Sequence, residues 1–160
     1  MNILIRLLDY NEHSFLKEMS YQAIFIPEGE PSLPNDIINL PQLSKYFENW
    51  GRQGDYCLIA EYEGEKIGAI WCRLFDTQNK GFGFVSKDIP ELSIAVDKTY
   101  RNKGVGSMLL EGFCRHLKKE GFQTISLSVN KSNPAVNLYL RIGFKIIRTN
   151  ENDHIMIKEL

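Results

Sequence analysis

Apolar and polar positions follow two clear periods along this chain, and glycine and proline mark where one period gives way to the other. A period of two predicts a strand, and a period of 3.6 predicts a helix. Strands are expected at residues 2–8, 56–62, 66–72, 92–96, 123–129, 144–148 and 155–158, and helices at 12–25, 41–50, 105–120 and 133–142. Strand–helix–strand units imply parallel pairing and hairpins imply antiparallel pairing, so the pattern predicts a mixed α/β fold.

The two later helices are the best defined. The first carries an apolar stripe made of Val105, Leu109, Phe113 and Leu117. The second opens at Asn133-Pro134, a capping residue followed by proline, and stops at Gly143. Its inward face includes Tyr139, which the pattern alone explains as a core residue. Two long irregular segments remain, the Pro/Gly-rich stretch 27–35 and the connection 76–90.

Composition narrows the possible functions. A length of 160 residues predicts one domain, residues 1–160. The net charge is 19 − 20 = −1, which provides no general field for a nucleic-acid backbone. No apolar run has the roughly 18 residues of a membrane span, and the first residues do not resemble a signal peptide. Cys57, Cys72 and Cys114 are odd in number and widely spaced. We therefore expect free thiols in a cytoplasmic protein and no metal site.

The most informative segment for chemistry is 96–107, which joins a strand to a helix. It holds three cations, Lys98, Arg101 and Lys103, and two glycines, Gly104 and Gly106. Unpaired N–H groups at a helix N-terminus favour an anion, so the segment is typical of a phosphate cradle. An ordinary strand–helix turn with solvated lysines explains it equally well. Two known phosphate motifs do not fit: Ser107-Met108 replaces the Lys-Ser/Thr of a Walker A loop, and Leu109 replaces the last Gly/Ala of a dinucleotide fingerprint.

Two motifs together resemble the GCN5-related N-acetyltransferase (GNAT) family. The first, Arg101-Asn102-Lys103-Gly104-Val105-Gly106, has the form Arg/Gln-x-x-Gly-x-Gly/Ala of the family's acyl-CoA loop. The second, Asn133 to Phe144, has every fixed position of Asn-x-x-Ala-x-x-Leu-Tyr-x-x-x-Gly-Phe. The resemblance covers about residues 91–147.

The resemblance implies a single-domain, partly parallel, splayed sheet of six to seven strands with about four helices. Acetyl-CoA is the implied co-substrate, and its pantetheine arm enters the gap beside the fourth strand. The implied contacts are backbone groups of Ile94, Ala95 and Val96, a pyrophosphate loop of Arg101, Asn102, Lys103, Gly104, Val105, Gly106 and Ser107, and a second wall with Asn133 and Asn137.

The family reaction is direct attack of an amine on the thioester in a ternary complex. A carboxylate must then accept the amine proton. Glu91, at the start of the fourth strand, is the candidate base, provided that the pleat turns it toward the cleft. Tyr139 is the implied general acid for the leaving thiolate, and a main-chain N–H near Val96 would meet the developing oxyanion.

The acceptor stays open. A peptide N-terminus, a polyamine, an aminoglycoside or an amino acid all fit, with Glu28, Glu30 and Asp36 as acidic residues of the variable loops. No nucleic acid or membrane is expected as a partner, and a homodimer is a candidate assembly. Two other classes remain: a non-catalytic acyl-CoA sensor, and an interaction module using Gly81-Phe82-Gly83-Phe84.

Overall fold

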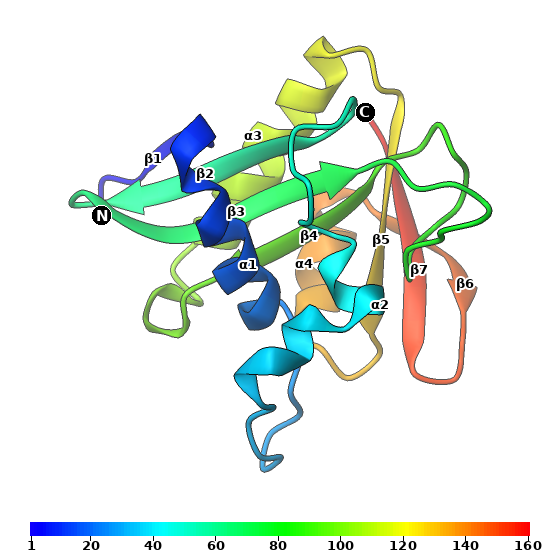
Figure 1. Ribbon diagram of the computed structural model, residues 1–160, viewed down its shortest axis with the longest axis horizontal. Coiled ribbons are helices and arrows are strands. Elements are labelled where there is room, and N and C mark those ends of the chain that lie inside the picture. The colour runs from blue at the N-terminus through cyan, green and yellow to red at the C-terminus, as the bar shows by residue number, and fades with distance from the viewer.

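One mixed sheet runs through the molecule in the order β1-β2-β3-β4-β5-β7-β6. The computed structural model describes all residues, 1–160 (Figure 1). The strands are β1 (Leu4–Leu7), β2 (Tyr56–Tyr62), β3 (Glu65–Arg73), β4 (Glu91–Val96), β5 (Thr124–Asn130), β6 (Lys145–Thr149) and β7 (Asp153–Glu159). The α-helices are α1 (His13–Gln22), α2 (Pro41–Ser44), α3 (Val105–Lys119) and α4 (Ala135–Ile142). Short 3-10 turns η1 (Tyr10–Glu12), η2 (Asn35–Asn39) and η3 (Lys98–Tyr100) complete the chain. Every strand and helix expected from the sequence is present.

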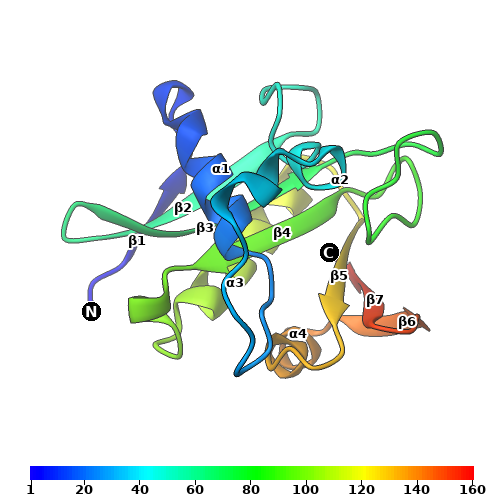
Figure 2. The same ribbon diagram turned by 60° about the horizontal axis from the view of Figure 1, so that its bottom comes forward.

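The sheet divides between β4 and β5. All other neighbouring strands pair in antiparallel ladders, whereas β4 and β5 are parallel and share one pair of partners, Glu91 and Ser126. Ser126 N–H donates to Pro90 O at 3.0 Å on the same side. Beyond this point the two strands separate, as Figure 2 shows. The expected splayed sheet is confirmed.

Each face of the sheet has its own apolar core. Helix α3 packs on one face through its predicted stripe, and Leu109, Phe113 and Leu117 are fully buried there. Helix α1 packs on the other face, where Phe15, Leu16 and Met19 meet β2, β3 and β4. Figure 2 shows α1 and α3 on opposite sides of β3 and β4. The two helices therefore pack the first four strands into one unit, beside which the gap opens.

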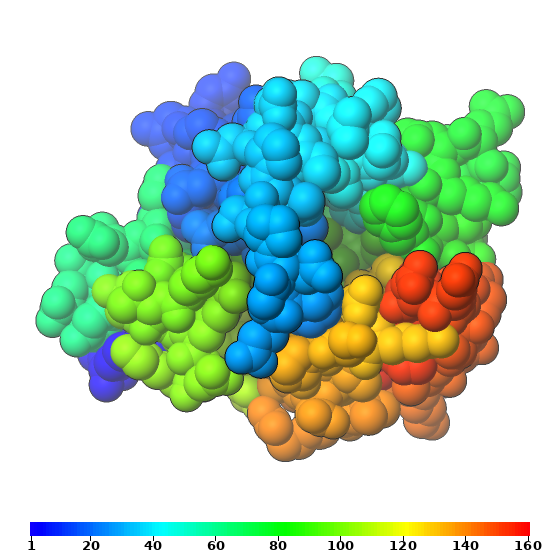
Figure 3. Space-filling model, turned by 90° about the horizontal axis from the view of Figure 1, so that it is seen from below, coloured from blue at the N-terminus to red at the C-terminus, as the bar shows by residue number.

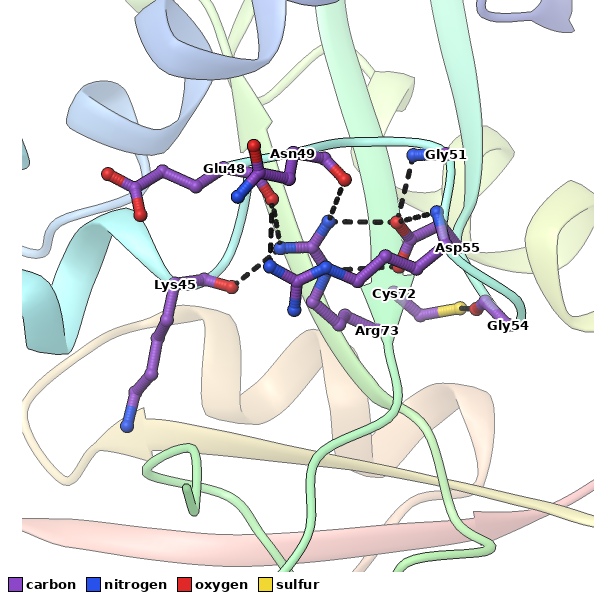
Figure 4. Close-up of polar contacts among 9 residues, drawn as sticks. Lys45, Glu48, Asn49, Gly51, Gly54, Asp55, Cys72 and Arg73 are labelled. Carbon is purple, nitrogen blue, oxygen red and sulfur yellow. Dashed lines mark hydrogen bonds and ion pairs between the residues drawn. The ribbon is translucent and has the colours of Figure 1, made fainter. Parts of the chain in front are cut away.

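The predicted helix 41–50 is shorter than expected. Regular α-helix covers only Pro41–Ser44, and residues 45–49 form turns. The reason is the buried guanidinium of Arg73, which donates to the carbonyl oxygens of Lys45 at 2.9 Å and Glu48 at 2.6 Å (Figure 4). These carbonyls are bound from the side instead of continuing a helical ladder. Asn49 then adopts a positive φ of 52°, which ends the segment.

Arg73 is itself neutralised by Asp55. The two form a bidentate ion pair, with Nε to Oδ1 at 2.9 Å and Nη2 to Oδ2 at 2.8 Å, and both side chains are almost fully buried. Asp55 Oδ2 also accepts N–H bonds from Gly51 and Arg52. A buried charge requires such full pairing, because an uncompensated one costs several kcal/mol. The end of β3 and the 45–55 segment are thus fastened together.

The three cysteines are free, as expected, and Cys57 and Cys72 are buried. Burial raises the pKa of both thiols well above its ordinary value. No helix of this fold is both long and apolar enough to cross a bilayer.

Candidate active site

A continuous cleft of about 1940 Å³ begins where β4 and β5 separate. One arm lies between the two strands and is closed by the β4–α3 loop and α4. The other arm runs over the opposite face of β4, beneath α1, η2 and residues 24–30. Figure 3 shows the segment after α1 crossing the mouth, between the β4–α3 loop and the turn after β5. Glu91 and Tyr139 both line this cleft, so the fold brings the two predicted catalytic residues into one space.

The β4–α3 loop is built by short-range hydrogen bonds. Asp97 accepts from Thr99 N–H at 2.9 Å, and Arg101 Nε donates to Val96 O at 2.8 Å. Gly104 precedes α3 with φ +84°, a left-handed conformation that favours glycine. The first N–H groups of α3 have no partner within the helix, and Gly104, Gly106 and Ser107 beside them line the cleft, as an anion site requires.

Gly106 has a packing role in addition to the one its motif suggests. A Cβ placed there would lie 3.3 Å from Leu138 Cδ2, on α4. The glycine therefore lets α3 approach α4 closely, as well as lining the cleft. Alanine fits with a small movement of Leu138, whereas a larger side chain would displace it or enter the cleft.

Only some of the predicted backbone contacts on β4 are available. Asp97 N–H donates to Ile67 O on β3 at 2.8 Å. Hydrogen-bonded pairs alternate along an antiparallel ladder, so the main-chain groups of Ala95 also face β3, opposite Ala69. Those of Ile94 and Val96 face the gap. The expectation for Ala95 as a backbone contact is thus wrong, and this residue contributes only its methyl group to the cleft.

Most of the remaining predicted binding residues lie along the cleft. Those that line it are Arg101, Asn102, Gly104, Gly106, Ser107, Asn133, Asn137 and Tyr139. The Val105 side chain points into the core and is 1% exposed, so only its backbone can contribute. The Lys103 ammonium lies over the Tyr100 ring, 5.5 Å from its centre, and does not line the cleft.

Helix α4 supplies the wall opposite β4. Asn133 Oδ1 accepts from Ala135 N–H at 2.9 Å, so this side chain fixes the start of the helix. Tyr139 is 7% exposed and packs edge-on against Phe144, with ring centres 5.8 Å apart. Burial raises the pKa of Tyr139 to about 12. The phenol therefore keeps its proton at neutral pH and can act as a donor.

Glu91 is turned toward the α1 side of the sheet and is 3% exposed. Its Oε2 accepts a hydrogen bond from the Tyr46 hydroxyl at 2.5 Å, and its Oε1 accepts one from Gly83 N–H at 2.9 Å. A carboxylate has about four lone-pair positions, so each oxygen keeps capacity for a further partner. Glu91 also lines the cleft. The pleat of β4 therefore turns this side chain toward the cleft, as a general base requires.

Burial and hydrogen bonding act on Glu91 in opposite directions. Loss of solvent disfavours the charged form, while the donors Tyr46 and Gly83 and the charge of Lys45 favour it. Burial is the larger effect and raises the pKa of Glu91 from 4.5 to about 7. A carboxyl group with this pKa exchanges protons readily near neutral pH, which suits a general base.

The sequence did not single out Tyr46 or reveal the role of the glycines in the 76–90 connection. A Cβ on Gly81 would lie 2.2 Å from Glu91 Oε1, and one on Gly83 would lie 2.7 Å from the β5 backbone at Leu127. Ser126 Oγ also donates to Gly83 O at 2.8 Å. The Gly-Phe-Gly-Phe segment thus packs on Glu91 and β5. The repeated glycine was the available signal, and it indicated close packing.

Comparison with known proteins agrees with this geometry. A family model described as the acetyltransferase (GNAT) family matches residues 20–144. An N-alpha-acetyltransferase of Sulfurisphaera tokodaii is 35% identical over 100 residues, 56% of each chain. The chain spans 56 to 62% of the length of the first curated relatives it matches.

Two solved structures share the fold over nearly the whole chain. PaiA N-acetyltransferase from Thermoplasma acidophilum, in complex with coenzyme A, is 22% identical with a TM-score of 0.70 and 100% coverage of both chains. YncA, a putative acetyltransferase from Salmonella typhimurium with acetyl-CoA, is 18% identical with a TM-score of 0.71. The alignment covers 100% of this chain and 95% of that one.

The buried carboxyl predicts a pH-dependent stability. The pKa of Glu91 is higher in the folded than in the unfolded protein, so proton binding to Glu91 stabilises the fold. This stabilisation is fully present below pH 4.5 and is lost as the pH rises through about 7. Glu91→Gln removes this dependence. The stability of the variant relative to the wild type should rise by roughly 3 kcal/mol between acid and pH 8. Urea unfolding at several pH values measures this, and a pH-independent difference would contradict the assignment.

Proposed function

Because the chain belongs to the acetyltransferase (GNAT) family, we propose that it transfers the acetyl group of acetyl-CoA to a primary amine by direct attack in a ternary complex. The observation that carries the proposal is the position of Glu91. This carboxyl lies in the cleft at the point where β4 leaves β5, and its pKa is raised to about 7. A pure acyl-CoA sensor has no need of an ionisable group placed there.

The gap beside β4 fits the co-substrate. The main-chain N–H and C=O of Ile94 are free to pair with the amide groups of the pantetheine arm, as a neighbouring strand would. The Val96 carbonyl already accepts from Arg101 Nε at 2.8 Å, so this residue offers only its N–H. The loop from Arg101 to Ser107 ends at the N-terminus of α3, where unpaired N–H groups and the helix dipole attract the pyrophosphate. Asn133 and Asn137 lie on the facing wall. Acetyl-CoA supplies an activated acyl group on a thiol leaving group.

Glu91 addresses the main cost of the reaction. A lysine-like amine has a pKa near 10.4, so at pH 7 only about one molecule in 2,500 is neutral. Supplying the neutral amine therefore costs about 4.6 kcal/mol. Glu91 accepts the proton, directly or through water, and offsets part of this cost. A pKa of about 7 makes it a stronger proton acceptor than an ordinary glutamate.

Tyr139 and Val96 act on the leaving sulfur and on the carbonyl oxygen of the thioester, the other two atoms that change charge. Tyr139 donates a proton to the leaving sulfur and is protonated throughout the neutral range. A thiol pKa near 8.5 means that the leaving group needs only about 2 kcal/mol of help. The N–H of Val96 faces the gap, which supports it as the donor to the developing oxyanion.

The acceptor is a small-molecule or peptide amine. The relative from Sulfurisphaera tokodaii is named an N-alpha-acetyltransferase, which supports a peptide N-terminus among the candidates. The acceptor enters beneath α1 and residues 24–30, where Glu28 and Glu30 line the cleft. Asp36 lies outside the cleft, which removes it from the acidic residues considered for the acceptor.

The proposal covers residues 1–160 as one catalytic domain, in the cytoplasm, with a homodimer as a candidate assembly. Three free thiols support a reducing compartment. A net charge of −1 supports the absence of a nucleic-acid partner. The direct experiment is thiol release from acetyl-CoA across a panel of amines. Release that depends on an amine supports the transferase, and binding without release supports the sensor.

Acetyl-CoA should raise the melting temperature, because a ligand at 100 times Kd stabilises the folded state by about 2.7 kcal/mol. Gly106→Val should abolish the shift, since the added methyl groups push Leu138 aside or occupy the cleft. Gly106→Ala is the matched control and should retain it. Thermal denaturation with acetyl-CoA, NAD or ATP measures the effect. A shift with NAD or ATP and none with millimolar acetyl-CoA would refute the proposal.

Tyr139→Phe separates a catalytic role from a packing role, because it keeps the ring and removes the hydroxyl. As general acid, Tyr139 should contribute about 10–100-fold to kcat, with little effect on stability or acetyl-CoA affinity. The loss should fade with a thioester whose thiol is more acidic. If the residue is structural, the variant loses about 1 kcal/mol of stability or less and keeps its turnover. Steady-state kinetics with both thioesters distinguishes the two.

A further inference from the structure

Tyr46 follows α2 in the sequence, yet its hydroxyl lies against Glu91 of β4, 45 positions away. The ring is 8% exposed, packs edge-on against Phe75 with centres 5.0 Å apart, and stacks on Phe82 with centres 6.3 Å apart. Packing on two sides leaves the ring little freedom. This packing holds the Tyr46 hydroxyl in position against the Glu91 carboxylate.

A backbone N–H favours Tyr46 as the donor of the Tyr46–Glu91 hydrogen bond. Phe82 N–H donates to the Tyr46 oxygen at 2.7 Å, so that oxygen is already an acceptor. The hydroxyl proton is then free to donate to Glu91 Oε2, at 2.5 Å. Burial and the neighbouring Glu91 raise the pKa of Tyr46 well above its ordinary value, so the phenol remains a donor. Gly83 N–H holds the other carboxylate oxygen.

The segment carrying Tyr46 is itself clamped. Arg73, paired with Asp55, donates to the carbonyls of Lys45 and Glu48 on either side of Tyr46 (Figure 4). Arg73 is also the cross-strand partner of Glu91 on β3. Arg73 therefore connects β4, which carries Glu91, to the segment that carries Tyr46.

Few other charges act on Glu91. Lys45 lowers its pKa through its charge, and its ammonium donates to Lys80 O. The Arg73 charge is balanced by Asp55. The 81–84 segment and the adjoining Ser126 of β5 contribute no ionisable group in this range. Lys17 and Glu18 of α1 line the same cleft with opposite charges.

Resting on the proposed function, we propose that Tyr46 is a positioning residue for the general base. Its hydroxyl, oriented by Phe82 N–H and held by the Arg73–Asp55 clamp, favours the ionised form of Glu91 and positions its carboxylate in the cleft. Tyr46 takes no proton from the substrate and touches no reacting atom. Its effect reaches the reaction only through Glu91.

Tyr46→Phe tests the proposal without requiring activity. Hydrogen bonds to a charged group favour the charged form, so losing this donor should raise the pKa of Glu91 by about one pH unit or more. Carbon-13 NMR of the glutamate carboxyl carbons measures the titration, with Glu91→Gln identifying the signal. Tyr56→Phe is the matched control: it removes a tyrosine–glutamate hydrogen bond, to Glu120, outside the cleft. It should leave the Glu91 titration unchanged.

The same variants are then assayed as enzymes. Relative to wild type, Tyr46→Phe should lose about tenfold in kcat/KM at pH 6 and little at pH 9, because a smaller fraction of Glu91 is ionised at low pH. The acceptor's own titration is common to both proteins and cancels in the ratio. A shifted NMR titration with no effect on the pH–rate profile would confirm that Tyr46 lowers the pKa of Glu91, but would overturn Glu91 as the base. An unshifted titration would overturn the role of Tyr46.

A second variant protects the test against misfolding of Tyr46→Phe. Site-specific difluorotyrosine at position 46 keeps the ring and makes the hydroxyl a stronger donor. The Glu91 titration should then move to lower pH, opposite to the phenylalanine variant. Equal movement in the same direction for both variants would indicate a packing effect and refute the proposal.

Discussion

The single parallel contact between β4 and β5, at Glu91 and Ser126, determines the rest of the molecule. A parallel pair normally satisfies the main-chain groups of both strands along their length. Here the strands separate after one pair, and both main-chain groups of Ile94 and the N–H of Val96 lack a strand partner, while Val96 O accepts from Arg101. The gap is stable because α1 and α3 hold β1–β4 as one unit and β5 is anchored to β7 by seven paired residues. The gap between β4 and β5 is therefore a fixed feature of the fold.

The same contact explains the chemistry of Glu91. The point where the strands meet is dry, so an acid placed there is driven toward its neutral form. Two donors, Tyr46 and Gly83, oppose this but do not overcome it, and the pKa reaches about 7. Without donors the group would be neutral at physiological pH and useless as a base. In water its pKa would be ordinary and its proton affinity too low. The loops that surround Glu91 set the balance between these extremes.

The sequence was sufficient for the frame and for half of the site. Periodicity placed every strand and helix, and the two motifs located the β4–α3 loop and Tyr139. What it could not provide is the packing of irregular segments. Arg73 shortens the helix predicted at 41–50 by binding its carbonyls, and no local pattern reveals a partner 25 residues away. Tyr46 lacks a motif, and Gly81 and Gly83 are informative only once Glu91 and β5 are beside them. The register on β3, which turns the Ala95 backbone away from the gap, is likewise a tertiary property.

In the proposed reaction, Glu91 removes the amine proton. The most direct test is the pH dependence of kcat/KM for the wild type and Glu91→Gln, using one amine identified by thiol release. The loss should be largest near neutral pH, where free amine is scarce, and should shrink as the pH approaches the amine pKa. A loss that is the same at every pH, or no loss at all, would contradict this role of Glu91 and assign the proton to another group.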